Sequence, residues 1–174
     1  MKRWAKNQTG FTVVELLIVI VVIAILAIII VVTYNGVQNR AHDASVQNDL
    51  SNFVKKVQMY EASNGKFPRG TVELTTLDIK LSKDSYSRGM YNGASYYNFV
   101  YCWPNSSLDP EKFAVIAESK SGRTFTYSGG VFTDSDTPLA TSSTSACSAA
   151  GVPLASGNDR DWLYHADAWM SYVK

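Results

Sequence analysis

The sequence predicts an α+β protein in which a long N-terminal α-helix packs against a small antiparallel β-sheet head. Three observations support this fold class. Residues 16–32 are wholly apolar, an apolar stripe at helical spacing continues to Tyr60, and short aromatic and β-branched segments follow between Tyr96 and Thr133. The 174 residues suffice for one membrane segment and one domain of ordinary size.

The apolar run predicts a helix that crosses a membrane. From Phe11 to Val32 the only ionisable side chain is Glu15, and a helix of this length can cross a bilayer core about 30 Å thick. Basic residues precede the run and the next one is Arg40, so the positive-inside rule places the N-terminus in the cytoplasm and the rest of the chain outside. An ordinary secretory signal fits poorly, because the run exceeds about 7–15 residues and lacks a good A-x-A site after it.

Helical periodicity continues beyond the membrane segment. Apolar residues recur mainly at spacings of three, four or seven, with polar residues on the other faces. The expected apolar stripe is Val37, Ala41, Ala44, Leu50, Phe53, Val54, Val57 and Tyr60. The expected wet side is Arg40, His42, Asp43, Gln47, Asn48, Asp49, Lys55 and Lys56. No proline precedes Pro68, so residues 11–63 can form one helix that stops at Asn64-Gly65.

The remaining residues predict a globular, β-rich head. Three or four antiparallel strands are expected at 96–103, 113–118, 123–127 and 131–133, and Ser128-Gly129-Gly130 indicates a hairpin turn. These strands would pack on the exposed half of the long helix.

Three segments of the head are expected to lie outside the sheet. Residues 71–95 would form an exposed connection anchored by Leu74, Leu77, Ile79 and Leu81. Residues 134–153 would form a loop rich in Ser, Thr and Ala. The near-helical spacing of Trp162, Ala166, Trp169 and Val173 suggests a short helix or an aromatic clasp.

The composition and the motifs give little sign of other chemistry. Apolar residues make up 46% of the chain, which indicates a folded core, and a net charge of +1 gives no overall basic field for nucleic acid. His42 and His165 lack zinc-site spacing, and no nucleophile elbow, phosphate-binding loop or dinucleotide motif occurs. Asp134 and Asp136 either bind calcium or are merely solvated, and Asn105 begins a glycosylation pattern that is common by chance. We expect no enzyme, no cofactor and no defined metal site.

A short motif stands at the start of the apolar run. The stretch TGFTVVELL, Thr9 to Leu17, follows a short basic leader and has Gly, then Phe, a small hydroxyl residue, two variable residues, Glu and an apolar run. In this order the residues resemble the processing site of type IV prepilins and related pseudopilins, with the expected cut after Gly10. The segment YEASNGKFP, residues 60–68, more weakly resembles the end of the long helix in many family members. The chain lacks the helix-kinking proline that many pilins carry near the end of the apolar segment.

The resemblance implies a processed subunit that polymerises. A prepilin peptidase would cut between Gly10 and Phe11 and N-methylate Phe11. An assembly ATPase and a platform protein would then extract the subunit from the cytoplasmic membrane into a helical filament of copies of itself at the cell surface. The chain would divide into a leader (1–10), a transmembrane and assembly helix (11–35), the exposed half of the long helix (36–64) and the head (65–174).

Glu15 acquires a physical role in such a filament. Its carboxylate would neutralise the new amine of Phe11, on its own chain or a neighbour, because a buried charge pair costs far less than either charge alone. The alternative is that Glu15 only marks the membrane interface.

Cys102 and Cys147 are the only cysteines, and an isolated pair outside the cytoplasm is expected to form a disulfide. Such a bond resembles the disulfide-bounded loop near the C-terminus of many pilins, although about 27 residues follow it here. Two free buried thiols are the alternative.

The leading hypothesis is a structural subunit of a type IV pilus that serves adhesion, motility or DNA uptake. The alternatives are a pseudopilin of a type II secretion or competence system and an uncleaved single-pass anchor that carries a binding domain. A membrane-tethered enzyme is the least supported hypothesis. Any ligand of the head, whether a surface or DNA, is left unidentified by the sequence.

Overall fold

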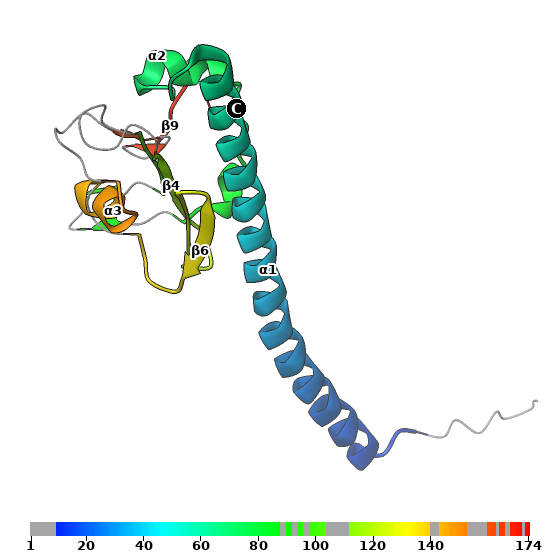
Figure 1. Cartoon of the computed structure of the whole chain (residues 1–174). Helices are drawn as coiled ribbons and strands as arrows, with labels where there is room; N and C mark the ends of the chain where they lie inside the picture. The colour runs from blue at the N-terminus through cyan, green and yellow to red at the C-terminus, as the bar shows by residue number, and fades with distance from the viewer. Residues whose placement is uncertain are drawn as a thin grey trace, which may run out of the picture. The chain divides into compact units, whose positions relative to one another are not determined.

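The computed structural model describes residues 10–87, 90–91, 94–95, 98–103, 112–139, 143–152, 160–162, 164–165, 168–171 and 173–174. Its contacts divide the chain into an N-terminal unit, residues 1–38, and a head unit, residues 39–174. The first helix, α1 (Val13–Asn64), contributes residues to both units (Figure 1).

Helix α1 runs without interruption over 52 residues, as the periodicity predicted. It ends where Gly65 adopts a φ of +69° and donates its N–H to the carbonyl oxygen of Glu61 at 2.7 Å. Glycine reaches this left-handed conformation without steric cost, so the Asn64-Gly65 stop signal operates through backbone geometry.

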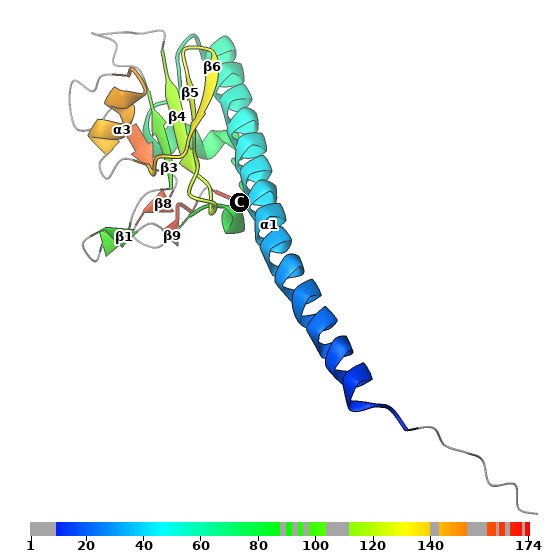
Figure 2. The same ribbon diagram turned by 90° about the horizontal axis from the view of Figure 1, so that it is seen from below.

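A five-stranded antiparallel sheet forms the centre of the head (Figure 2). Its strands are β3 (Phe99–Cys102), β4 (Ala114–Glu118), β5 (Thr124–Ser128), β6 (Val131–Ser135) and β7 (Arg160–Trp162), in the order β6-β5-β4-β3-β7. The β5–β6 hairpin turns at Gly129 and Gly130, whose φ values are +55° and +89°, as the glycine pair predicted. The α+β fold class is confirmed, and β7 is an additional strand that the sequence did not indicate.

Short elements surround the sheet. They are α2 (Gly70–Leu74), the 3-10 turns η1 (Thr75–Leu77) and η2 (Lys83–Ser85), α3 (Ser143–Ala149), and the paired short strands β1 (Met90–Tyr91) with β2 (Ala94–Ser95) and β8 (Tyr164–His165) with β9 (Ala168–Trp169). The four anchors predicted for the connection after α1 are all buried: Leu74, Leu77, Ile79 and Leu81.

Alternation along the strands divides the core of the head between the two faces of the sheet. One face packs against the part of α1 that belongs to the head, where Phe53 lies edge-on to Phe99 and Tyr101 with centroid distances of 5.2 and 5.4 Å. The other face carries Val100, Cys102, Ala114 and Ile116 and packs against Ala146 and Cys147 of α3. The head therefore has three layers, with the sheet between α1 and α3 (Figure 1).

The structure corrects the predicted apolar stripe of α1. Val37, Ala41 and Ala44 are exposed, whereas Asp43 and Asp49, expected on the wet side, are only 8% and 5% exposed. The buried face actually follows Asp43, Val46, Leu50, Phe53 and Val57, at alternating spacings of three and four. The two aspartates tolerate burial because polar groups of the head bind their carboxylates, as described below.

Two further predictions for the head are corrected. The expected Ser/Thr/Ala-rich loop, residues 134–153, contains the helix α3. The first residues of this segment belong to β6, which extends to Ser135. Of the two options expected for the C-terminal segment, the short helix is wrong, because Trp162 lies in β7 and Trp169 lies in β9. Tyr96, Asn105 and Ala166 lie outside the described residues.

Candidate functional site

A reciprocal pair of hydrogen bonds closes the first turn of α1. Thr12 precedes the helix, and its backbone N–H and its side-chain hydroxyl both donate to Oε2 of Glu15 at 2.8 Å. In return, the backbone N–H of Glu15 donates to Oγ1 of Thr12 at 3.2 Å. This is a capping box, which satisfies N–H groups that the first turn of a helix otherwise leaves without partners. The carboxylate also lies at the positive end of the helix dipole.

Thr12 is a residue whose role the sequence analysis missed. The roles predicted for Glu15 were those of a partner for an amine and of a marker of the membrane interface. The signal for Thr12 is nevertheless present, because T-V-V-E directly before an apolar run matches the capping-box pattern S/T-x-x-E. Oε1 of Glu15 accepts no hydrogen bond from the described residues, so this oxygen is available to a further donor.

The peptide bond between Gly10 and Phe11 lies just before the capped turn. Both residues are outside any helix or strand, and Phe11 is 90% exposed. A Cβ atom placed on Gly10 would meet nothing within 4 Å. Packing among the described residues therefore does not explain why this position is glycine.

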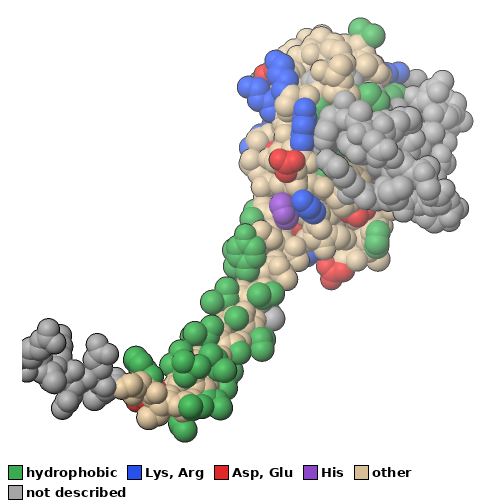
Figure 3. All heavy atoms as spheres, turned by 180° about the vertical axis from the view of Figure 1, so that it is seen from behind, with side chains coloured by type: hydrophobic (Ala, Val, Ile, Leu, Met, Phe, Trp, Pro, Cys, Tyr) green, Lys and Arg blue, Asp and Glu red, His purple; other side chains and the backbone are tan. Residues whose placement is uncertain are grey.

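The helix that follows presents an apolar surface on all sides within the N-terminal unit. The large aliphatic side chains from Leu16 to Val31 are 48–68% exposed, and hydrophobic side chains cover this part of α1 in Figure 3. Among the described residues, α1 is the one helix long and apolar enough to cross a membrane. Such a surface is far larger than water-soluble monomers usually expose, and it is typical of a segment that lipid or other protein covers.

In the head, Asp49 fixes α1 to the segment that follows η1. Its Oδ2 accepts hydrogen bonds from the backbone N–H of Ser82 at 2.6 Å and from the hydroxyl of Tyr86 at 3.0 Å. Burial raises the pKa of Asp49 above its ordinary value, and the hydrogen bonds from Ser82 and Tyr86 partly oppose that rise. Burial, together with the nearby carboxylate, also holds the pKa of Tyr86 well above its ordinary value.

Asp43 makes a second polar attachment between α1 and the head. Its carboxylate accepts a hydrogen bond from the hydroxyl of Ser121 and lies 3.9 Å from Nη1 of Arg123. The same guanidinium pairs with Asp134 and approaches Oδ1 of Asp136 at 3.2 Å. The cationic guanidinium of Arg123 thus lies beside Asp134 and Asp136, the two residues for which the sequence left calcium binding open. No group of three or more His, Cys, Asp or Glu side chains suited to a metal occurs in the described part of the chain.

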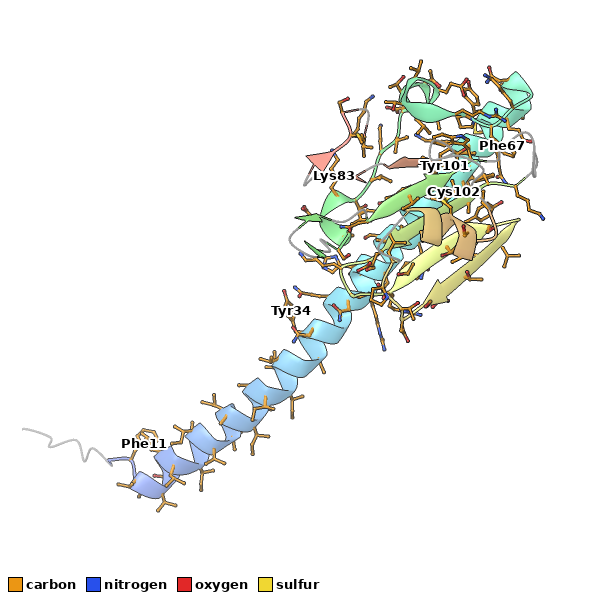
Figure 4. The ribbon with its side chains drawn as sticks, turned by 90° about the vertical axis from the view of Figure 1, so that its left-hand side faces the viewer. Phe11, Tyr34, Phe67, Lys83, Tyr101 and Cys102 are labelled. Atoms are coloured by element: carbon orange, nitrogen blue, oxygen red, sulfur yellow. A yellow bond between two sulfur atoms is a disulfide. The ribbon has the colours of Figure 1, made fainter. Side chains whose placement is uncertain are left out.

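Cys102 and Cys147 form the disulfide that the sequence predicted. Their Cα atoms are 5.8 Å apart, and both residues are fully buried. The bond joins β3, whose Tyr101 and Cys102 are labelled in Figure 4, to α3 on the face of the sheet opposite α1.

A comparison with protein-family models matched residues 5–31 to the prokaryotic N-terminal methylation motif. The matched range contains Gly10, Phe11, the capping pair Thr12 and Glu15, and nearly all of the apolar run. A comparison with curated proteins found no match. By this motif, the chain carries the class III signal of type IV pilins and pseudopilins.

Proposed function

We propose that this chain is the precursor of a structural subunit of a type IV pilus. The observation that carries the proposal is the order of features at the N-terminus. An accessible Gly10–Phe11 bond is followed at once by a capped helix start and then by an apolar surface that no described residue covers. The methylation motif matches this same segment.

In the proposed pathway, the apolar helix first lies in the cytoplasmic membrane and later in the centre of the filament. A prepilin peptidase removes residues 1–10 and methylates the amine of Phe11. An assembly ATPase and a platform protein then move the subunit out of the lipid. Because the helices of neighbouring copies replace lipid around it, the apolar surface stays out of water at every stage.

Glu15 supplies the charge balance of the proposed filament. Cleavage creates a cationic amine on Phe11, close to the helix start where Oε2 of Glu15 is held by Thr12. Oε1 is then the oxygen that would accept the amine of the same or a neighbouring chain. A subunit out of register would leave both charges unpaired in an apolar environment, which is strongly unfavourable.

The N-terminal motif is shared by pilins and pseudopilins, so a subunit of a secretion or competence pseudopilus is the alternative. The location of the processed chain distinguishes them, because a pilus subunit accumulates in fibres sheared from cells whereas a pseudopilin remains with the membrane.

The proposal can be tested by replacing Gly10 with valine. Gly10→Val should leave the chain at its precursor mass and abolish sheared fibres. Gly36→Val is the matched control, because an added Cβ at Gly36 also meets nothing within 4 Å, and this variant should be processed normally. Efficient removal of residues 1–10 from the Gly10→Val chain would contradict the proposal.

A second variant separates processing from assembly. Glu15→Ala should be cleaved at a normal rate but should form few fibres, because the Phe11 amine then has no carboxylate partner. The measurement is the ratio of processed chain in sheared fibres to processed chain in membranes. A ratio equal to that of the wild type would refute the role assigned to Glu15.

A further inference from the structure

Strand β6 is an exposed edge of the central sheet. It pairs with β5 on one side, and no described strand pairs with its other side. All five of its residues are exposed, and they include the large apolar side chains of Val131 and Phe132, which are 61% and 50% exposed. Natural edge strands are commonly protected by lysine, proline or a covering element, and β6 contains neither residue. An apolar edge of this kind is typical of a surface that binds another chain.

The far end of β6 adds negative charge to this surface. The side chains of Asp134 and Asp136 are 50% and 90% exposed although both contact Arg123. We name Val131, Phe132, Asp134 and Asp136 the β6 edge. It combines an apolar end with an acidic end over six residues of sequence.

A hollow of about 270 Å³ lies beside the last turns of α1. It is lined by Lys56, Met59, Tyr60, Ser63, Asn64, Thr76 and Leu77, and we name it the Met59 hollow. Met59 is 69% exposed at its rim, and the adjacent Lys55 is exposed as well. The hollow is therefore apolar inside and basic at the border, the reverse charge of the β6 edge.

The two surfaces lie on opposite sides of α1. Leu50 lines the side of α1 that faces Phe132 of β6, whereas Met59 lines the hollow. These residues are nine positions apart, which is about two and a half helical turns and places their side chains about half a turn apart around the axis. One head can therefore use both surfaces at the same time.

We propose that the β6 edge of one head docks into the Met59 hollow of the head of a second copy of this chain. Val131 enters the hollow, and Asp134 and Asp136 lie against Lys55 and Lys56 of the other copy. Because the two surfaces differ, the contact is heterologous and can repeat without closing into a dimer. The inference rests on the proposed function as a filament subunit and names the head surfaces that meet in the filament.

Cysteine cross-linking of the full-length chain in its cells tests the contact. The chain's own two cysteines are joined in a disulfide, so the introduced cysteines supply the thiols that react with the cross-linker. Chains that carry both Val131→Cys and Met59→Cys are treated with a short bismaleimide. A ladder of dimers, trimers and higher species is expected from the double variant, with loss of the ladder in either single variant. The matched control pairs Val131→Cys with Val72→Cys, since Val72 is 81% exposed but lies outside the hollow, and should give no ladder.

Each result other than the expected ladder would contradict the proposed contact between heads. Dimers from Val131→Cys alone would show that two β6 edges meet symmetrically, and an equal ladder from the Val72→Cys pair would show unspecific collision. No ladder from the double variant would show that the surfaces do not meet. Fibre yield is measured in the same cells, so fibres without a ladder refute only the head contact, whereas unprocessed chain without fibres refutes the proposed function too.

Charge reversal provides an independent readout of the same contact. Asp136→Lys should lower the cross-linked fraction of the double-cysteine chain by up to about fivefold, because exposed ion pairs contribute modestly. Adding Lys55→Glu to this chain should restore the fraction. A reversal that has no effect, or that the second substitution fails to restore, would contradict the assigned charge pairing.

Discussion

Removal of the disulfide should destabilise the head by an amount that the structure allows us to estimate. Cys102 and Cys147 are 45 residues apart, and the chain-entropy relation for a closed loop of that size gives about 13 cal/mol/K, or about 4 kcal/mol at room temperature. Domains of ordinary size unfold with about 5–15 kcal/mol, so this loss is a large share of the total. Both cysteines should be replaced by alanine together, because a single replacement leaves a reactive thiol.

The free energy of unfolding can be measured by denaturant titration of the full-length chain in detergent, with tryptophan fluorescence as the signal. Ser148→Ala is a suitable control, because Ser148 neighbours Cys147 in α3 but is exposed, and it should change stability by less than about 0.5 kcal/mol. A loss below about 1 kcal/mol in the double-alanine variant would refute the view that the bond between β3 and α3 stabilises the head by restricting the unfolded chain.

Three further predictions concern the core of the head, the attachment at Asp49 and the start of α1. Phe53→Ala should cost about 3–5 kcal/mol of unfolding free energy, because the ring is 2% exposed, whereas Met59→Ala should cost less than about 0.5 kcal/mol; equal losses would contradict the assigned core. Burial raises the folded-state pKa of Asp49, so the wild type should lose stability relative to Asp49→Asn as the pH rises above about 3.9, and a pH-independent difference would contradict this. Thr12→Ala should weaken the start of α1 by about 1 kcal/mol and accelerate amide hydrogen exchange in its first turn, and Thr12→Ser should restore protection.

The long helix and its end could be predicted because their causes are local in the sequence. The apolar run from residue 16, the lack of proline and the Asn64-Gly65 stop each act within a few residues of the structure they determine. The β5–β6 hairpin was predictable for the same reason, since the Gly129-Gly130 pair alone provides the turn.

The buried face of α1 was predicted less well because it depends on distant partners. Asp49 is buried because Ser82 and Tyr86, 33 and 37 residues later, bind its carboxylate. Asp43 is buried beside Ser121, 78 residues later. A hydrophobicity pattern assigns aspartate to solvent and contains no information about groups that the fold brings to it.

Pairing between distant strands explains the errors near the C-terminus. Trp162 and Trp169 happen to be spaced almost as in a helix, but Trp162 lies in β7, which pairs with β3 so that Trp162 lies opposite Val100. The helix α3 was missed because its sequence, STSACSA, is rich in residues with weak helix preference. Its position is maintained by the disulfide at Cys147 and by burial of Ala146.

At the N-terminus, the sequence predicted roles for Gly10, Phe11 and Glu15, and the methylation motif includes these three positions. The geometry added Thr12, whose hydroxyl and N–H position one oxygen of Glu15 and leave the other available. The capping pattern T-x-x-E is local in the sequence, so the role of Thr12 was predictable from it.

We propose that this chain is cut after Gly10 and assembled into fibres through its apolar helix. The most direct test is the intact mass and N-terminal residue of the chain in fibres sheared from cells, compared with the membrane fraction. We expect an abundant species in the fibres that begins at Phe11 and carries one additional methyl group. A chain that still begins at Met1 in both fractions would contradict it.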